Sequence, residues 1–391
     1  MIARSILLFI AIIVLPDFFI WRKWLYGKGK PKWMKAVWVG QALALLAVTA
    51  WLAMSRDFTP QPQTPLNAYL LAVGVWVVPK CFFAIALWMR QLTAKSSNAL
   101  KIAATAPWIM LAILTVYVTV YGSTVGFDKV EVRKVVYYSE DLPEAFDGYR
   151  IALLSDIHVG SYTGMHQHVL GDAVDSIIGL RPDAIFFLGD IQNTRPEEVV
   201  EKMPVLKRLN APDGVLSILG NHDYSYYMGG SEAEKKRAEQ LTIDCQRKMG
   251  WRMLLNENVK IRRQNDSIVV AGLEGNDKIN TDHGYPRCDL AMEGIGNGCF
   301  TIMLVHNPAR WQEMVLPKTT AQLSLSGHTH GGQIDFFGLV EALPVEVNGM
   351  YEKDGRSLFV TAGLGALIPL RFGVTGEVVE LILRKGKKNN H

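Results

Sequence analysis

The hydrophobic and polar positions divide the chain into two unlike parts. Residues 1–126 contain long apolar runs at approximately Ile6–Ile20, Ala36–Met54, Leu66–Trp88 and Thr105–Gly122, whereas the remainder alternates short apolar segments with polar ones. A helix of about 20 apolar residues crosses the hydrocarbon core of a bilayer. Tryptophan and tyrosine gather at the edges of the runs, as they do at a membrane–water interface. The pattern predicts a transmembrane region of about four spans over residues 1–126.

Neither a signal peptide nor a soluble helical core accounts well for these runs. A cleaved signal peptide accounts for one apolar run but not for a series of them. Helices buried in a soluble core are seldom uncharged over so many successive runs. The apolar region is also why hydrophobic residues make up 49% of the 391 residues and why the mean hydropathy is +0.12. That composition excludes a disordered chain.

Lysine and arginine are spread unevenly over the segments that connect the runs. Six lie between the first two runs, one between the second and third, and three between the third and fourth. Because basic loops stay in the cytoplasm, the segment after Gly126 is expected on the other side. The first run is short and contains Asp17, so the orientation depends on whether that run spans. We expect a multi-pass protein of the inner or plasma membrane with its soluble part on the non-cytoplasmic side.

Lys80 interrupts the third run beside Pro79. An ionisable residue inside a span is a functional candidate. A lysine can also extend its head group to water, and the proline can break the helix. The sequence favours this second interpretation.

The soluble part contains five short apolar segments that each end in polar residues of metal-binding type. Arg150–Ser155 precedes Asp156 and His158, Ala184–Leu188 precedes Asp190, Gly214–Leu219 precedes Asn221 and His222, Phe300–Val305 precedes His306, and Ala321–Ser326 precedes His328 and His330. Their length and β-branched content indicate buried strands. Helical segments fill the gaps, one of them opened by a capping box from Ser231 to Glu234. Because functional residues gather at the carboxyl ends of strands in α/β sheets, we expect one site.

The side chains at these strand ends suit divalent cations. The expected ligands are Asp156, His158, Asp190, Asn221, His306, His328 and His330. Carboxylate, amide and imidazole donors without a thiolate suit Mn, Fe or Zn. In an extended segment residues i and i+2 point the same way, so Asp156 and His158 can grip one ion. Seven ligands exceed the four that one zinc takes and suffice for two ions that share a bridging carboxylate.

A pair of cations at this site would act at phosphorus. Two cations neutralise the phosphoryl oxygens and favour ionisation of a water that attacks in line. His222 directly follows one expected ligand, and Asp223 is the next residue. A histidine oriented by a carboxylate can serve as the general acid for the leaving alkoxide, although His222 can also act as a substrate clamp.

The order of these motifs resembles that of a known family. Asp-x-His, Gly-Asp, Gly-Asn-His-Asp, a later His and Gly-His-x-His follow one another as in the calcineurin-like metallophosphoesterase superfamily. Residues 361–373 are similar to its membrane-associated bacterial branch. The resemblance implies an α/β fold: a two-sheet sandwich flanked by helices, here preceded by a four-helix transmembrane region. We expect that region at 1–126, a linker with an edge strand at 127–148, the metallophosphoesterase domain at 149–385 and a basic tail at 386–391.

The resemblance also implies how the ligands divide between two divalent metal ions. One ion would be held by Asp156, His158, Asp190 and His330, and the other by Asp190, Asn221, His306 and His328, with Asp190 bridging. His222 carries over as the acid, supported by Asp223. The family often has a polar residue shortly after Gly-Asp; here that residue is Asn193.

Several other residues are open to more than one interpretation. Arg371 can hold a substrate phosphate or form a surface salt bridge. The loop Tyr224–Gly230 can line the substrate pocket or pack on a helix. The four histidines outside the motifs are expected at the surface: His166, His168, His283 and His391. The soluble part has three cysteines, so a Cys288–Cys299 pair would leave one over, and no disulfide is predicted.

These features predict a membrane-anchored, metal-dependent phosphoesterase that cleaves a phosphodiester or a phosphorylated lipid or envelope component. Its expected partners are membrane lipids and a phosphate-ester substrate, which can be lipid-linked. A net charge of +4 is too small for a dedicated nucleic-acid binder. One alternative is a pyrophosphatase of a nucleotide-sugar lipid, but its cytoplasmic substrate conflicts with the loop charges. A non-catalytic, metal-stabilised membrane sensor is another, and a transporter is a third, although the spans offer few polar residues.

Overall fold

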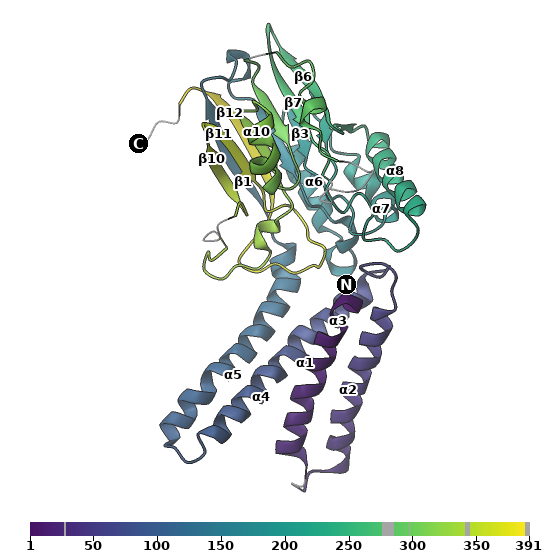
Figure 1. Cartoon of the computed structure of the whole chain (residues 1–391), viewed down its shortest axis with the longest axis vertical. Coiled ribbons are helices and arrows are strands. Elements are labelled where there is room, and N and C mark those ends of the chain that lie inside the picture. The colour runs from purple at the N-terminus through teal and green to yellow at the C-terminus, as the bar shows by residue number, and fades with distance from the viewer. Residues whose placement is uncertain (27–28, 276–284, 297, 341–344, 388–391) are drawn as a thin grey trace. The chain divides into compact units, whose positions relative to one another are not determined.

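The computed structural model describes the chain except residues 27–28, 276–284, 297, 341–344 and 388–391. The chain divides into two compact units, Met1–Ser123 and Thr124–His391 (Figure 1). His283 and His391 lie outside the described residues.

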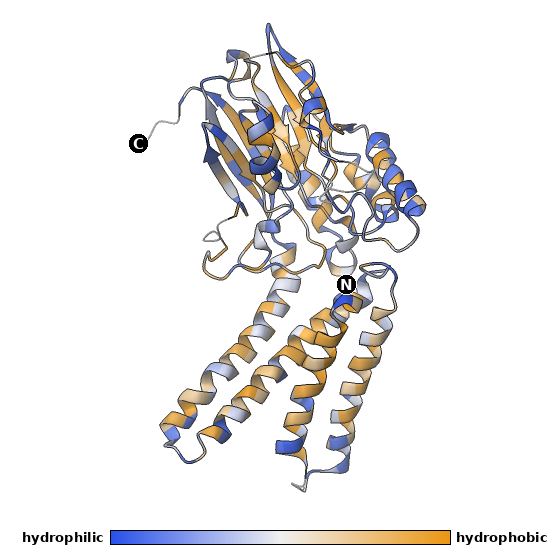
Figure 2. Cartoon of the chain, viewed as in Figure 1, coloured by the Kyte–Doolittle hydropathy of each residue, from blue (hydrophilic) through white to orange (hydrophobic). Residues whose placement is uncertain are grey.

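In the part of the first unit that the structure describes, all regular secondary structure is helical. Its helices are α1 (Ile6–Ile20), α2 (Lys32–Ala53), α3 (Thr64–Ala72), α4 (Val78–Leu92) and α5 (Asn98–Tyr121). Short helical turns extend them, so that four continuous segments are long and apolar enough to cross a membrane: Ile2–Leu25, Lys32–Ala53, Thr64–Leu92 and Asn98–Gly126. Figure 2 shows hydrophobic residues over most of their length. The predicted four-helix apolar region is therefore confirmed.

Pro79 does not break the third segment. A π-helical turn, Val73–Val77, joins α3 to α4, and Pro79 lies in the first turn of α4. Proline inside a helix removes one backbone hydrogen bond, and a π-helical turn directly before it is a local irregularity that can absorb that loss. The wide turn lets the helix continue through a sequence that predicted a stop.

Lys80 does not extend to water. Its Nζ lies 2.7 Å from Asp17 Oδ1 and 3.1 Å from Gln41 Oε1, and both charged side chains are buried. The rings of Trp38 and Trp76 lie 5.5 and 5.6 Å from the ammonium group. The favoured sequence interpretation was wrong because the partner of Lys80 is 63 residues away, on another helix.

The second unit is a sandwich of two mixed sheets. The first has the order β1-β12-β2-β3-β4-β5 and the second β10-β11-β9-β8-β7-β6. The strands of the first sheet are β1 (Val130–Ser139), β12 (Gly376–Lys385), β2 (Arg150–Leu154), β3 (Ala184–Phe187), β4 (Val215–Ser217) and β5 (Arg252–Met253). Those of the second are β10 (Gly349–Lys353), β11 (Arg356–Val360), β9 (Leu323–Ser326), β8 (Thr301–Leu304), β7 (Asp266–Gly272) and β6 (Glu257–Arg263).

Alternate residues of the strands fill separate cores. Ile151 and Leu153 of β2 share a buried cluster with Ile302 and Leu304 of β8, which lies between the sheets. Ala152 and Leu154 point to the other side. There they pack with the helices α6 (Val169–Leu180), α7 (Pro196–Leu206) and α8 (Glu232–Lys248). The predicted two-sheet sandwich flanked by helices is confirmed.

The outer side of the second sheet has its own cover. Residues of β7, β8 and β11 pack there against Trp311 and Val315, and against α9 (Cys288–Ala291). The short α10 (Leu316–Lys318) follows directly. The four cysteines are free thiols.

The central strands of both sheets are parallel. In the first sheet, β2, β3, β4 and β5 run the same way, and in the second, β7, β8, β9 and β11 do. The carboxyl ends of parallel strands lie at one edge of a sheet, so the loops that follow them meet there.

Candidate metal centre

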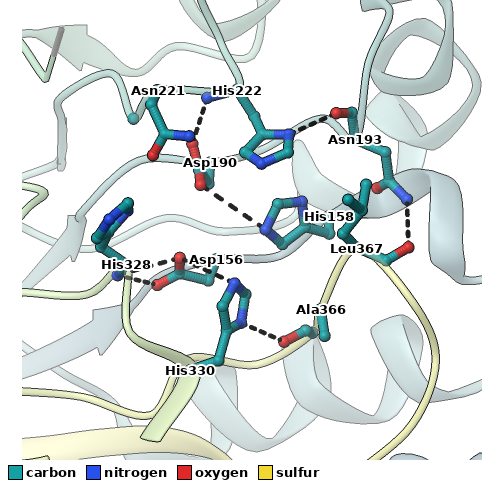
Figure 3. Close-up of polar contacts among 12 residues, drawn as sticks. Asp156, His158, Asp190, Asn193, Asn221, His222, His328, His330, Ala366 and Leu367 are labelled. Atoms are coloured by element: carbon teal, nitrogen blue, oxygen red, sulfur yellow. Dashed lines mark hydrogen bonds and ion pairs between the residues drawn. The ribbon is translucent and has the colours of Figure 1, made fainter. Parts of the chain in front are cut away.

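The expected ligands come from loops that follow five strands in both sheets. Strands β2, β3 and β4 lead into Asp156, Asp190 and Asn221, and β8 and β9 lead into His306 and His328. Figure 3 shows that Asp156, Asp190, Asn221 and His328 gather around one site from different loops. The fold therefore brings together residues that are up to 174 positions apart, from Asp156 to His330.

The backbone at the site is unusual. Asp156, His158, Asp190, His328 and His330 all adopt the left-handed region, with φ between 48° and 72°. Residues other than glycine rarely occupy it, and such residues cluster at functional sites. This conformation turns each side chain inward at the end of its strand.

Two glycines allow the loops to approach closely. A Cβ on Gly220 would lie 2.2 Å from Asp190 Oδ1, and one on Gly327 would lie 2.3 Å from Asp156 Oδ2. Any larger residue at either position would push a carboxylate out of place.

Three overlapping groups of side chains can hold a metal ion. They are Asp156, His158 and His330; His158, Asp190 and His222; and Asp190, His306 and His328, with the ligand atoms of each group within 4.8 Å of one another. Asp190 Oδ2 lies 3.7 Å from His158 Nε2 and 3.2 Å from His306 Nε2. One carboxylate thus faces both sides of the site, as a bridging ligand would.

His158 and Asp190 are in the protonation states that suit a bound cation. Burial, with the nearby His222, lowers the pKa of His158 well below its ordinary value, so this ring is neutral. Burial would raise the pKa of Asp190, but the charges of His306 and His222 hold it well below its usual range. An ionised carboxylate beside a neutral imidazole is the form in which both bind cations.

His158 is an orphaned buried group. The ring is fully buried, yet neither ring nitrogen has a hydrogen-bond partner among the residues that the structure describes. Buried polar atoms without a partner are rare and call for an unseen ligand such as an ion or a water. The donor set therefore fits a divalent cation at this position.

His306 gives a second sign of a cation. Burial would lower its pKa, but Asp190 raises the pKa to about 10. Its Nε2 lies 3.2 Å from Asp190 Oδ2 and 3.2 Å from Asn221 Oδ1. The proton on His306 Nε2 faces these two oxygens and supplies positive charge where a bound cation would supply it.

Backbone carbonyls set the orientation of the histidine rings. Nδ1 of His306 lies 2.8 Å from the carbonyl oxygen of Leu188, and Nδ1 of His330 lies 3.1 Å from that of Gly365. A carbonyl accepts only, so Nδ1 carries the proton and Nε2 is left for the site.

Asp223 does not orient His222, contrary to the sequence analysis. Its carboxylate accepts hydrogen bonds from the backbone amides of Gly220, Asp190 and Ile191 at 2.8–2.9 Å. The His222 ring is instead held through Nδ1 by the carbonyl oxygen of Asn193, at 2.5 Å. Adjacent residues in this tight turn point in opposite directions, so Asp223 shapes the Asp190 loop.

Arg371 neither reaches the site nor lies at the surface. It is fully buried, and its guanidinium donates to the carbonyl oxygens of Ala362, Gly363 and Gly365 at 2.6–3.2 Å. The carbonyl of Gly365 also accepts from His330. Both sequence interpretations of Arg371 were wrong, because it holds the loop that orients a candidate ligand.

One further sequence interpretation needs correction, and one that was left open is decided. His166 is buried, not exposed, and its Nδ1 lies 2.5 Å from Asp128 Oδ1, whereas His168 is exposed as expected. In the loop after His222, Tyr224 packs against α8, whereas the ring of Tyr227 stacks on His222 at 4.3 Å.

Neither Tyr227 nor a role for Asn193 was predicted from the sequence. Asn193 also fixes the loop after His158, because its Oδ1 accepts from Gly160 N at 3.1 Å and its Nδ2 donates to Ser161 Oγ at 2.9 Å. A polar residue shortly after Gly-Asp was the only signal for Asn193, and Tyr227 had none beyond its position in an aromatic loop.

Comparisons with known proteins agree with this site. The family model for calcineurin-like phosphoesterase matches residues 149–332. The uncharacterized metallophosphoesterase YkuE of Bacillus subtilis (strain 168) is 31% identical over 267 residues, which cover 65% of this chain and 86% of that protein. The transmembrane protein with metallophosphoesterase domain of Danio rerio is 26% identical over 402 residues, or 97% of this chain and 89% of that protein.

The chain belongs to the calcineurin-like metallophosphoesterase family, a family of hydrolases that use divalent metals. The relatives include a vertebrate protein as well as bacterial ones, so the resemblance is not confined to a bacterial branch. The apolar helices and the similarity to a transmembrane relative along nearly the whole chain indicate a membrane protein.

Proposed function

We propose that the chain is a membrane-anchored phosphoesterase that uses two divalent metal ions to hydrolyse a phosphodiester or a phosphorylated lipid or envelope component. The observation that carries the proposal is the position of Asp190. Its carboxylate lies between His158 and His306, which come from loops of different sheets. Such an arrangement is suited to two cations that share one ligand.

We assign the ligands in two groups. Asp156, His158, Asp190 and His330 would hold one ion, and Asp190, Asn221, His306 and His328 the other. The grouping is supported by the cluster of Asp156, His158 and His330, by that of Asp190, His306 and His328, and by the 3.2 Å between Asn221 Oδ1 and His306 Nε2. When bound, Mn, Fe or Zn ions supply positive charge for the phosphoryl oxygens and favour ionisation of the attacking water.

His222 is the proposed general acid. Because Nδ1 donates to Asn193, Nε2 is the nitrogen available to hold a transferable proton. The ring makes an edge contact with His158 at 4.7 Å, so it borders the proposed phosphate position. As the phosphorus–oxygen bond to the leaving group breaks, the proton on Nε2 passes to that oxygen.

The experiment that tests this function combines activity with metal content. The purified full-length protein with Mn²⁺ should hydrolyse bis-p-nitrophenyl phosphate. Asp190→Ala should reduce the rate by more than about 100-fold, because loss of a mere supporting contact to a ligand already costs 10–100-fold. The same variant should hold less manganese per chain by elemental analysis.

A matched control is His168→Ala, since His168 is an exposed histidine of the same domain. It should keep both its activity and its metal. Undiminished activity in Asp190→Ala, or equal metal content in the two variants, would contradict the proposed centre.

We further propose that the catalytic unit lies on the non-cytoplasmic side and that its partners are a phosphate ester and membrane lipids, without nucleic acid. The support is the excess of lysine and arginine in the first and third connecting segments.

A further inference from the structure

The polypeptide enters the catalytic unit at the edge that carries the candidate metal centre. β1 begins at Val130, which pairs in parallel with Gly376, the first residue of β12. β12 runs antiparallel to β2, so the start of β1 lies where β2 ends. Asp156 follows that end by two residues.

The entering segment is bound to a loop that follows two candidate ligands. The ring of Phe127 packs against Tyr162 at 5.7 Å and against His166 at 5.0 Å. Asp128 pairs with the same histidine at 2.5 Å. Residues 127–129 alone separate Gly126, the end of the last apolar segment, from β1. The four steps from Gly126 to Val130 span at most about 14 Å. The edge that carries the site therefore lies close to the end of a helix that is long enough to cross a membrane.

An exposed apolar turn lies at the same edge. It spans Asp335–Val340, shortly after His330, and is closed by a hydrogen bond of 3.1 Å from Val340 N to Asp335 Oδ1. Phe337 at its tip is 100% exposed, and Leu339 is 64% exposed. A single exposed apolar residue is ordinary, but several large ones close together mark a surface that binds something apolar.

The turn is held in place by its base. Asp335 N donates to the carbonyl oxygen of Phe372 at 2.7 Å, and Phe372 N donates to that of Gln333 at 3.1 Å. The ring of Phe336 packs on that of Phe372 at 5.3 Å. The exposure of Phe337 is therefore a property of an anchored turn.

A second exposed apolar side chain lies on the other segment of this edge. Met165 is 61% exposed and belongs to the short helix η7 (Gly164–His166). Its neighbour His166 is the residue that binds Asp128. Apolar side chains thus project both from the segment that follows His158 and from the one that follows His330.

We propose that the Asp335–Val340 turn and Met165 insert into the surface of the lipid bilayer, so that the metal centre acts on a phosphate ester carried by a lipid. The inference rests on the proposed function and names its substrate class. A lipid surface is the expected binding partner, because the short segment 127–129 keeps this edge near the membrane. A side chain such as phenylalanine or methionine gains by leaving water for the interfacial layer.

The test compares two phosphodiesters with the same reacting group. The full-length protein is reconstituted with Mn²⁺ in phosphatidylcholine vesicles. One substrate is hexadecyl p-nitrophenyl phosphate in the bilayer, and the other is ethyl p-nitrophenyl phosphate in solution. Phe337→Asp combined with Leu339→Asp should lower the rate on the hexadecyl ester at least 10-fold and leave the rate on the ethyl ester within twofold.

The control is Ile178→Asp, an exposed apolar position near the end of α6, which leads back to the opposite edge. It should change neither rate. An equal loss on both esters, or no loss on the hexadecyl ester, would overturn the inference. Failure of the unaltered protein to cleave either ester would count against the proposed function instead.

A second measurement does not depend on activity. In a chain whose four cysteines are replaced by alanine, a nitroxide is attached at Phe337→Cys and, for comparison, at Glu140→Cys beyond the far end of β1. In phosphatidylcholine vesicles the label at 337 should collide more with oxygen than with a water-soluble nickel complex, and the label at 140 the reverse. A label at 337 that is open to nickel, or shielded from both by a protein partner, would refute membrane insertion.

Discussion

Tyr227 shows how one side chain can prepare two others for chemistry. Its hydroxyl accepts a hydrogen bond from Asn221 Nδ2 at 3.1 Å, and its ring stacks on His222. Because the amide nitrogen is engaged by the phenol, Asn221 Oδ1 is the atom left facing His306, at 3.2 Å. The phenol therefore selects the end of the amide that can bind a cation.

We expect Tyr227→Phe to weaken one metal site more than the other. Loss of the hydroxyl lets the Asn221 amide rotate, and affinity for the ion assigned to Asn221 should fall by about 10-fold or more. Calorimetric titration with manganese would measure the affinity of each site. Tyr138→Phe, at an exposed position on β1, serves as the control. Two unchanged binding steps in Tyr227→Phe would show that the hydroxyl does not orient Asn221.

At the scale of elements, α1, α2 and α4 meet at a buried polar cluster. Asp17, Gln41 and Lys80 each come from a different helix. Gln41 Nε2 donates to Asp17 Oδ2 at 2.6 Å, and its Oε1 accepts from Lys80 Nζ at 3.1 Å. In hydrocarbon an unpaired charge is costly, whereas a matched pair fixes which helices assemble.

The cluster predicts that the double substitution destabilises the helical unit less than the single one does. Lys80→Met leaves the Asp17 carboxylate unpaired and should destabilise the helical unit by about 3–5 kcal/mol. Adding Asp17→Leu removes the orphaned charge and should restore most of that loss. Thermal unfolding of the helical circular dichroism signal in mild detergent would measure both, with Lys95→Met in a connecting segment as the control. Equal melting temperatures for the single and double variants would mean that Lys80 and Asp17 do not stabilise each other.

At the scale of the whole molecule, the site exists only when both sheets are in place. Asp156, Asp190 and Asn221 follow strands of one sheet, and His306, His328 and His330 follow strands of the other. Bound cations would therefore join the two halves of the sandwich as well as serve catalysis.

The side of the membrane on which this unit lies is also a property of the whole chain. Because the first and third connecting segments carry the excess of basic residues, alkaline phosphatase fused after His391 should be active. A fluorescent protein fused at the same place should be dark. The opposite pair of results would place the site in the cytoplasm and favour a pyrophosphatase of a nucleotide-sugar lipid.

The sequence by itself determined the family, the four apolar helices and the two-sheet fold. The apolar helices and the short strands depend on local signals, namely the length of an apolar run, the strand ends in Asp, Asn or His, and the capping box. The two-sheet arrangement came from the family resemblance that the order of the motifs carries. The capping box forms as predicted, with Glu234 N donating to Ser231 Oγ at 3.3 Å and Ser231 N donating to Glu234 Oε2 at 2.7 Å.

Only the tertiary structure decided what each polar side chain touches. Lys80 finds Asp17 on another helix, Asp223 binds the amides of the Asp190 loop, and Arg371 is buried among carbonyl groups. Neighbours in sequence were poor guides because hydrogen bonds and ion pairs form between whichever groups the packing brings within about 3 Å. Residue type sets which partners a side chain can accept, and the fold sets which of them it meets.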